Sequence, residues 1–215
     1  MVRMITAAAV LTIAGSAMAV PTGAHWEMVD NSATAGPGGV GLAASWMTFD
    51  LFVDLEPGDS ITVVDFGGSG PNAGLNTDGT VFQVGPPFGS DHFSTNAGFF
   101  GFVDNLEYDT SVALGTEATT STGPIDWSPA GFVGTWFAAT SGNSASGPAF
   151  VARITVSNDT TFLGGELFVS GTGPNGDFGQ QVPSTGVVSV PNAKIPTPGA
   201  LALFGLAGAA ATRRR

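Results

Sequence analysis

The stretch TFDLFVDLEPGDSITVVDF at residues 48–66 decides the predicted fold. Its first half alternates apolar side chains with Thr48, Asp50 and Asp54, and a period of two is typical of a half-buried strand. The apolar members of this alternation are Phe49, Leu51, Val53 and Leu55. Glu56-Pro57-Gly58-Asp59 then places proline and glycine for a type II turn, after which the alternation resumes. The pattern predicts a β-hairpin over residues 48–66.

Other short apolar runs predict further strands. The clearest covers residues 150–156, where Phe150, Ala152, Ile154 and Val156 alternate with Val151, Arg153 and Thr155. The remaining predicted strands cover residues 80–84, 99–103, 106–114, 132–138, 162–170 and 186–190. About nine short strands separated by turns predict an all-β fold, an antiparallel β-sandwich, with a jelly roll or a barrel as the alternatives.

The charge is strongly acidic and unevenly distributed. Four of the six basic residues lie near the ends, at Arg3 and in the terminal run 213–215, whereas all 17 acidic residues lie between Glu27 and Asp177. The part between the ends therefore carries two basic residues against 17 acidic ones, a formal charge of −15. A surface of this sign repels phosphate, so nucleic acid is excluded as a partner. It favours solubility outside the cell, with divalent-cation binding as the sharper alternative.

Residues 1–19 have the three parts of a secretory signal peptide. Arg3 lies in a short start, an apolar run covers residues 5–15, and the small residues Ala17 and Ala19 frame a cleavage site. The apolar run is shorter than the roughly 20 residues that a permanent membrane helix needs. We expect cleavage after Ala19. The 215-residue chain contains no cysteine, so the exported domain at residues 20–193 would fold without disulfides.

The C-terminal segment 194–215 predicts a second targeting signal. Pro196-Thr197-Pro198 precedes an apolar run at residues 199–211, and Arg213, Arg214 and Arg215 end the chain. At a rise of 1.5 Å per residue, this run gives about 20 Å of helix, which is short for stable spanning. The arginines would remain on the cytoplasmic side, which places the domain outside. A C-terminal helix packed in the core of the domain is the alternative.

This tail, IPTPGALALFGLAGAAATRRR, resembles the PEP-CTERM sorting signal. The resemblance covers about a tenth of the chain and departs from the family pattern at Thr197, where a glutamate is usual. The same motif is also labelled an ice-binding protein C-terminal motif, without implying ice binding here. The resemblance implies processing by an exosortase, a membrane protease-transpeptidase of bacteria that make exopolysaccharide and biofilm matrix. It also implies a protein that is transiently anchored in the membrane before it reaches the cell surface.

Signals for catalysis are weak, and we expect no enzyme and no catalytic residue. The stretch Gly67-Gly68-Ser69-Gly70-Pro71 lacks the last glycine of a nucleophile elbow, and a flexible loop explains it better. Glu107 and Asp109 would project from one side of the predicted strand 106–114 and could share a cleft as a glycosidase pair. Two solvated acids on an outer face would give the same pattern.

Metal and cofactor signals are also weak. His25 and His92 are the only histidines and favour surface or turn positions rather than a zinc site. Residues 76–79 and 174–177 resemble fragments of calcium loops, but neither completes the ligand spacing of such a loop. Asparagine- and aspartate-glycine turns are the simpler interpretation. We therefore expect no cofactor and no metal ligand set, calcium being the one ion that the excess of oxygen ligands would suit.

Aromatic residues leave two function classes open. Trp26, Trp46, Trp127 and Trp136, with Tyr108, could stack on sugar rings if exposed, although most tryptophans in a sandwich belong to the core. We expect a structural or adhesive protein of the cell envelope or extracellular matrix. The alternative is a carbohydrate-binding module or a carbohydrate-active enzyme. The expected partners are the secretion machinery, an exosortase-like protease and exopolysaccharide.

Overall fold

The computed structural model describes residues 21–67, 74–85, 87–89, 96–114, 119–121, 125–127, 131–138 and 148–187. The protein is mostly β-strand (49%) with almost no helix, which confirms the all-β prediction. The signal-peptide and sorting-tail predictions, at residues 1–19 and 194–215, lie outside the described residues.

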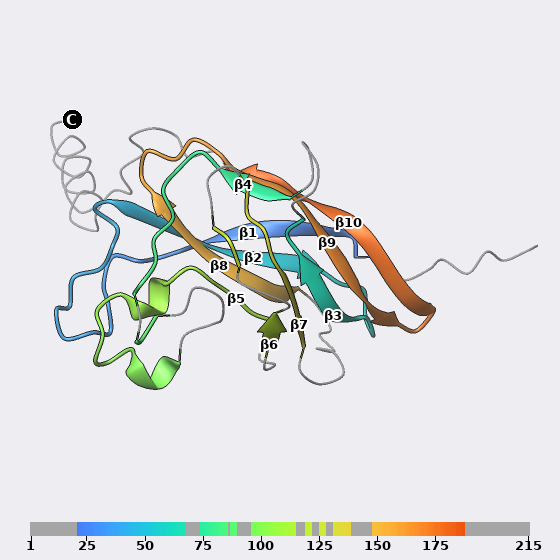
Figure 1. Ribbon diagram of the computed structural model, residues 1–215, viewed down its shortest axis with the longest axis horizontal. Helices are drawn as coiled ribbons and strands as arrows, with labels where there is room; N and C mark the ends of the chain where they lie inside the picture. The colour runs from blue at the N-terminus through green and yellow to red at the C-terminus, as the bar shows by residue number, and fades with distance from the viewer. Residues whose placement is uncertain are drawn as a thin grey trace, which may run out of the picture.

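Ten strands and two short 3-10 helices make up the described fold (Figure 1). The strands are β1 (Gly23–Val29), β2 (Trp46–Asp54), β3 (Ser60–Asp65), β4 (Leu75–Thr77), β5 (Ser111–Val112), β6 (Thr119–Ser121), β7 (Thr135–Ala138), β8 (Ala149–Ser157), β9 (Leu163–Gly173) and β10 (Gly176–Val187). The 3-10 helices are η1 (Ala97–Phe99) and η2 (Leu106–Tyr108).

The described strands form one nearly closed, barrel-like sheet. Their order is β5-β8-β2-β1-β10-β9-β3-β7-β6, with β4 pairing separately with β9. The pairs are antiparallel except for β1 and β10, which run parallel and meet at the single register pair Ala24–Ser184. The expected two-sheet antiparallel sandwich is not confirmed, because the sheet is single and mixed. In Figure 1, β9 and β10 form the long orange hairpin, and β1 lies beside β2.

The predicted turn at residues 56–59 is confirmed, but the predicted hairpin is wrong. Asp59 N donates to Glu56 O at 3.0 Å, and Gly58 has the positive φ of 93° that a type II turn requires. However, β2 pairs with β1 and β8, whereas β3 pairs with β7 and β9. Type II turns splay the strands that they join. The turn therefore carries the chain from one half of the curved sheet to the other.

The core lies inside the curved sheet. The alternation in β2 is confirmed, because Phe49, Leu51 and Val53 are buried. A cluster of buried rings packs in the core near β7, and Trp136 Nε1 donates to Ala113 O at 2.9 Å, which connects β7 to the residue after β5. The rings of this cluster are Phe66, Trp127, Phe132 and Trp136.

Three predicted strands need correction. Residues 99–103 form the end of η1 and turns, and residues 106–114 form η2 followed by the two-residue β5. Asn105 adopts a left-handed φ of 62°, which ends any extended run before η2. In residues 80–84, only Val81 forms a β-bridge, to Val156.

Three other predicted strands are confirmed with shifted bounds. Residues 132–138 contain β7, residues 162–170 fall almost wholly within β9, and residues 150–156 lie within β8. A bulge at Val151 interrupts the alternation of β8, so that Val151 is fully buried and Phe150 pairs with Phe52. Of the predicted strand 186–190, the first two residues belong to β10 and the rest lie outside the described residues.

Candidate functional site

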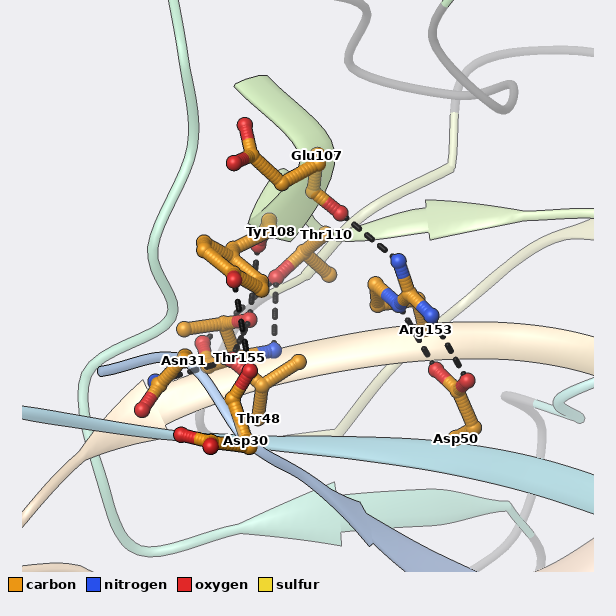
Figure 2. Close-up of polar contacts among 9 residues, drawn as sticks. All are labelled: Asp30, Asn31, Thr48, Asp50, Glu107, Tyr108, Thr110, Arg153 and Thr155. Atoms are coloured by element: carbon orange, nitrogen blue, oxygen red, sulfur yellow. Dashed lines mark hydrogen bonds and ion pairs between the residues drawn. The ribbon is translucent and has the colours of Figure 1, made fainter. Parts of the chain in front are cut away.

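A group of interacting polar side chains in the described part of the chain lies on the outer face of β2 and β8 (Figure 2). This is the face opposite the buried side chains of Phe49, Leu51 and Ile154. The register pairs Thr48 with Thr155 and Asp50 with Arg153. Both threonines are fully buried although they face away from the core. The segment 104–110 covers them. The alternating sequence pattern predicts a solvent-exposed face here and therefore does not predict this burial.

Arg153 connects the two strands to η2. Its Nε and Nη2 donate to the two carboxylate oxygens of Asp50, each at 2.7 Å, and its Nη1 donates to Glu107 O at 2.7 Å. Burial alone would lower the pKa of Arg153, but the hydrogen bonds and charge of Asp50 outweigh it and raise this pKa above its ordinary value. The guanidinium is therefore a permanent, bidentate partner of Asp50.

A directed chain of hydrogen bonds runs through the buried hydroxyls. Thr155 Oγ1 donates to Tyr108 O at 2.7 Å, so it accepts from Thr48 Oγ1 at 2.9 Å. Thr48 Oγ1 in turn accepts from Asn31 Nδ2 at 3.0 Å. The backbone N–H of Thr155 donates to Thr110 Oγ1 at 3.0 Å. Both threonine hydroxyls thus have their proton committed to an internal acceptor.

Tyr108 fastens the loop after β1. Its hydroxyl donates to Ala33 O at 2.6 Å and lies 3.2 Å from Asp30 O. Burial, followed by the negative charges of Glu107 and Asp30, raises the pKa of Tyr108 above its ordinary value. The hydroxyl therefore keeps its proton and acts as a donor.

Three further bonds hold residues 30–38 against residues 104–110. Ala35 N donates to Glu107 Oε1 at 2.7 Å, Gly38 N to Asp104 Oδ1 at 2.7 Å, and Asn105 N to Thr34 Oγ1 at 2.8 Å. We call this arrangement the clamp: residues 30–38, residues 104–110, and the outer-face residues Thr48, Asp50, Arg153 and Thr155. It links segments from four distant parts of the sequence.

The predicted carboxylate pair Glu107 and Asp109 is not a pair on one strand. Glu107 lies in η2 and Asp109 follows it, and each side chain serves a different segment. Glu107 accepts from Ala35, whereas Asp109 Oδ1 accepts from Val84 N at 2.7 Å. Each of the two acids therefore holds the backbone of a different segment in place, at Ala35 and at Val84 respectively.

Both calcium-like fragments lie where a strand meets a turn: residues 76–79 at the end of β4, and residues 174–177 between β9 and β10. Asp78 Oδ1 accepts from Thr161 N at 2.8 Å and Phe162 N at 2.9 Å, and its Oδ2 accepts from the Thr161 hydroxyl. The Thr161 side chain, followed by the Phe162 backbone, lowers the pKa of Asp78. Asn175 and Asp177 lie exposed at the β9–β10 turn. Within the described ranges, no group of three or more His, Cys, Asp or Glu residues could hold a metal ion.

His25 belongs to an aromatic row that the sequence did not reveal. Its ring stacks on Phe52 at 5.5 Å between centroids, and Phe52 contacts Phe150 at 5.7 Å. His25 Nδ1 lies 2.9 Å from Asp54 Oδ1, and Nε2 lies 3.7 Å from Glu27 Oε1. His92 and the loop serine Ser69 lie outside the described residues.

The tryptophans are mainly core residues. Trp127 and Trp136 are buried, and Trp26 and Trp46 are partly buried. The large exposed aromatic side chains of the described segments are phenylalanines, namely Phe88, Phe99, Phe102, Phe162 and Phe168. A tryptophan platform for sugar rings is therefore not supported by this structure.

No family model, curated protein or solved structure matches the chain. In the part of the chain that the structure describes, no helix has the length and apolar character needed to cross a membrane.

Proposed function

We propose that this protein is an exported, non-enzymatic component of the cell envelope or extracellular matrix, of structural or adhesive type. The clamp is the observation that carries the proposal. Its carboxylates, hydroxyls and guanidinium hold loops on the sheet through internal hydrogen bonds. Because these polar side chains are used in internal hydrogen bonds, we favour a structural scaffold over an enzyme. The functional part of such a scaffold would be its outer surface rather than a catalytic cleft.

The address of the protein rests on its two ends. The proposed signal peptide ends at Ala19, and the PEP-CTERM-like tail combines Pro196-Thr197-Pro198, an apolar run and three terminal arginines. We propose export by the secretion machinery, a pause in the membrane, and processing by an exosortase-like protease. The matrix partner would be exopolysaccharide.

Intact-mass measurement of the surface protein tests this address. A mature form that begins at Val20 and ends near Pro198 is expected. Replacement of Arg213, Arg214 and Arg215 by glutamine should release uncut protein into the medium, because the arginines resist crossing the bilayer. A mature form that still ends at Arg215 would contradict the sorting proposal and indicate a simple anchor.

We also propose that the two halves of the curved sheet form the two layers of a β-sandwich. Its halves, β5-β8-β2-β1 and β10-β9-β3-β7-β6, join through one parallel register pair. The type II turn between β2 and β3 carries the chain from one half to the other, as sandwich connections do.

A carbohydrate-binding module is the second candidate function. The aromatic row of His25, Phe52 and Phe150 favours it, because partly exposed rings beside the carboxylates of Glu27 and Asp54 could contact both the C–H face and the hydroxyls of a sugar. A glycan array with residues 20–193 tests this candidate. Specific binding that Phe52→Ala abolishes would support it, and binding unchanged in Phe52→Ala would reject this surface.

A further inference from the structure

The tip of the β9–β10 hairpin carries the one Asn-Gly pair of the sequence, Asn175–Gly176. The register pairs Gly173 with Gly176, so Pro174 and Asn175 form the two-residue connection. Residues 174–177 are all exposed. Solvent therefore reaches both the side-chain amide of Asn175 and the peptide bond that follows it.

The backbone around Gly176 is open. Apart from its two chain neighbours, no residue lies within 4 Å of the position that a Cβ would occupy on Gly176, and its φ is 118°. Pro174 fixes its own φ near −65°, which excludes the primed turn types and leaves the left-handed geometry to Gly176. Without a side chain on residue 176, the nitrogen of Gly176 can approach the side-chain carbonyl of Asn175 with little steric hindrance.

We propose that Asn175 is a site of spontaneous covalent self-modification. The nitrogen of Gly176 forms a bond to Cγ of Asn175, and the side-chain amino group leaves as ammonia together with the amide proton of Gly176. The resulting five-membered succinimide is opened by water at either carbonyl, which yields aspartate or isoaspartate. Water is the only co-reactant, and no group is oxidised or reduced. The product adds a carboxylate beside Asp177, and the isoaspartate form also lengthens the backbone at the turn.

Three asparagines in the described part of the chain have settings that disfavour the reaction. Asn31 is buried, and its Nδ2 donates to Trp46 O and Thr48 Oγ1. Asn158 is exposed, but Asp159 follows it, and its Nδ2 donates to Ala43 O at 3.3 Å. Asn105 precedes the branched Leu106. The reaction should therefore concentrate at Asn175 as long as the protein is folded.

Peptide mapping of the full chain tests the proposal. The purified protein would be incubated at neutral pH, and each asparagine peptide would be analysed for the mass gain of an amide-to-acid conversion. Isoaspartate would be labelled with an isoaspartyl methyltransferase. Conversion is expected at Asn175 ahead of every other asparagine, and Asn175→Gln should lose it because the longer side chain disfavours ring closure.

Asn158→Gln is the matched control at a second exposed turn and should leave conversion at Asn175 unchanged. Because the mapping is made on the wild-type protein, the result does not depend on how a variant folds. The proposal is overturned if Asn175 of the folded protein keeps its amide under conditions in which it converts in a urea-unfolded sample, or if another asparagine of the folded protein converts ahead of it.

Discussion

The two faces of β2 and β8 are built from alternating residues of the same strands, yet they are stabilised differently. The inner face carries Leu51 and Ile154, both fully buried among apolar side chains. The outer face carries the partly buried Asp50 and the fully buried Thr155, and both are hydrogen-bonded within the clamp. Apolar burial on the inner face is non-directional, so its contribution to stability falls when a substitution removes volume. The hydrogen bonds on the outer face are directional, so their contribution falls when a substitution removes a partner.

The largest effect is expected on the inner face. Leu51→Ala removes a fully buried side chain and leaves a cavity, which should lower the free energy of unfolding by about 3 kcal/mol. Urea denaturation followed by circular dichroism measures this loss. A loss of less than about 1 kcal/mol would show that the barrel collapses into the space and that the inner face is loosely packed.

Removing one charge from the outer face should lower the free energy of unfolding by less than Leu51→Ala does. Arg153→Met leaves Asp50 without its bidentate partner, and the expected loss is about 2 kcal/mol because the pair is partly exposed. The double variant with Asp50→Leu is the matched control, since it removes both charges together. It should be more stable than Arg153→Met alone. The single variant Asp50→Leu completes the cycle, and a loss in the double variant equal to the sum of the two single losses would show that the pair is not energetically coupled.

The difference between the faces also explains what the sequence could predict. A period of two identifies the inward residues of β2, because apolar burial leaves a repeating pattern. The bonds from Arg153 to Asp50 and from Tyr108 to Ala33 O join residues far apart in the chain and leave no periodic signal. One usable clue was Arg153 itself, the sole basic residue between Arg3 and Lys194.

Strand pairing was harder to predict than strand position. The turn at residues 56–59 has the expected type, but its residues specify only local geometry, and the partners of β2 and β3 depend on contacts across the barrel. The strand predicted at residues 106–114 failed for a related reason. Tertiary hydrogen bonds to Glu107 and Asp109 hold that segment in a compact form that apolar alternation does not reveal.

Asp59 is a buried polar group without a partner, and its contribution to stability can be compared with that of the paired Asp50. It is fully buried, and neither carboxylate oxygen has a hydrogen-bond partner, in contrast to Asp50. A buried polar group without a partner is destabilising, so Asp59→Leu should raise the free energy of unfolding by about 1 kcal/mol. Glu56→Leu in the same turn, where the residue is exposed, is the control and should change little. A destabilised Asp59→Leu would indicate that the carboxylate has a partner in solution.

Hydrogen exchange of Tyr108→Phe tests the central claim, that the clamp is one structural unit, most directly. The substitution removes only the hydroxyl that bonds to Ala33 O, so the global stability should fall by about 1 kcal/mol or less. The amides of Ala35, Gly38 and Asn105 should nevertheless lose protection together, while amides of β9 and β10 keep theirs. Wild-type protection at these three amides in Tyr108→Phe would contradict the claim and show that the clamp's hydrogen bonds act independently.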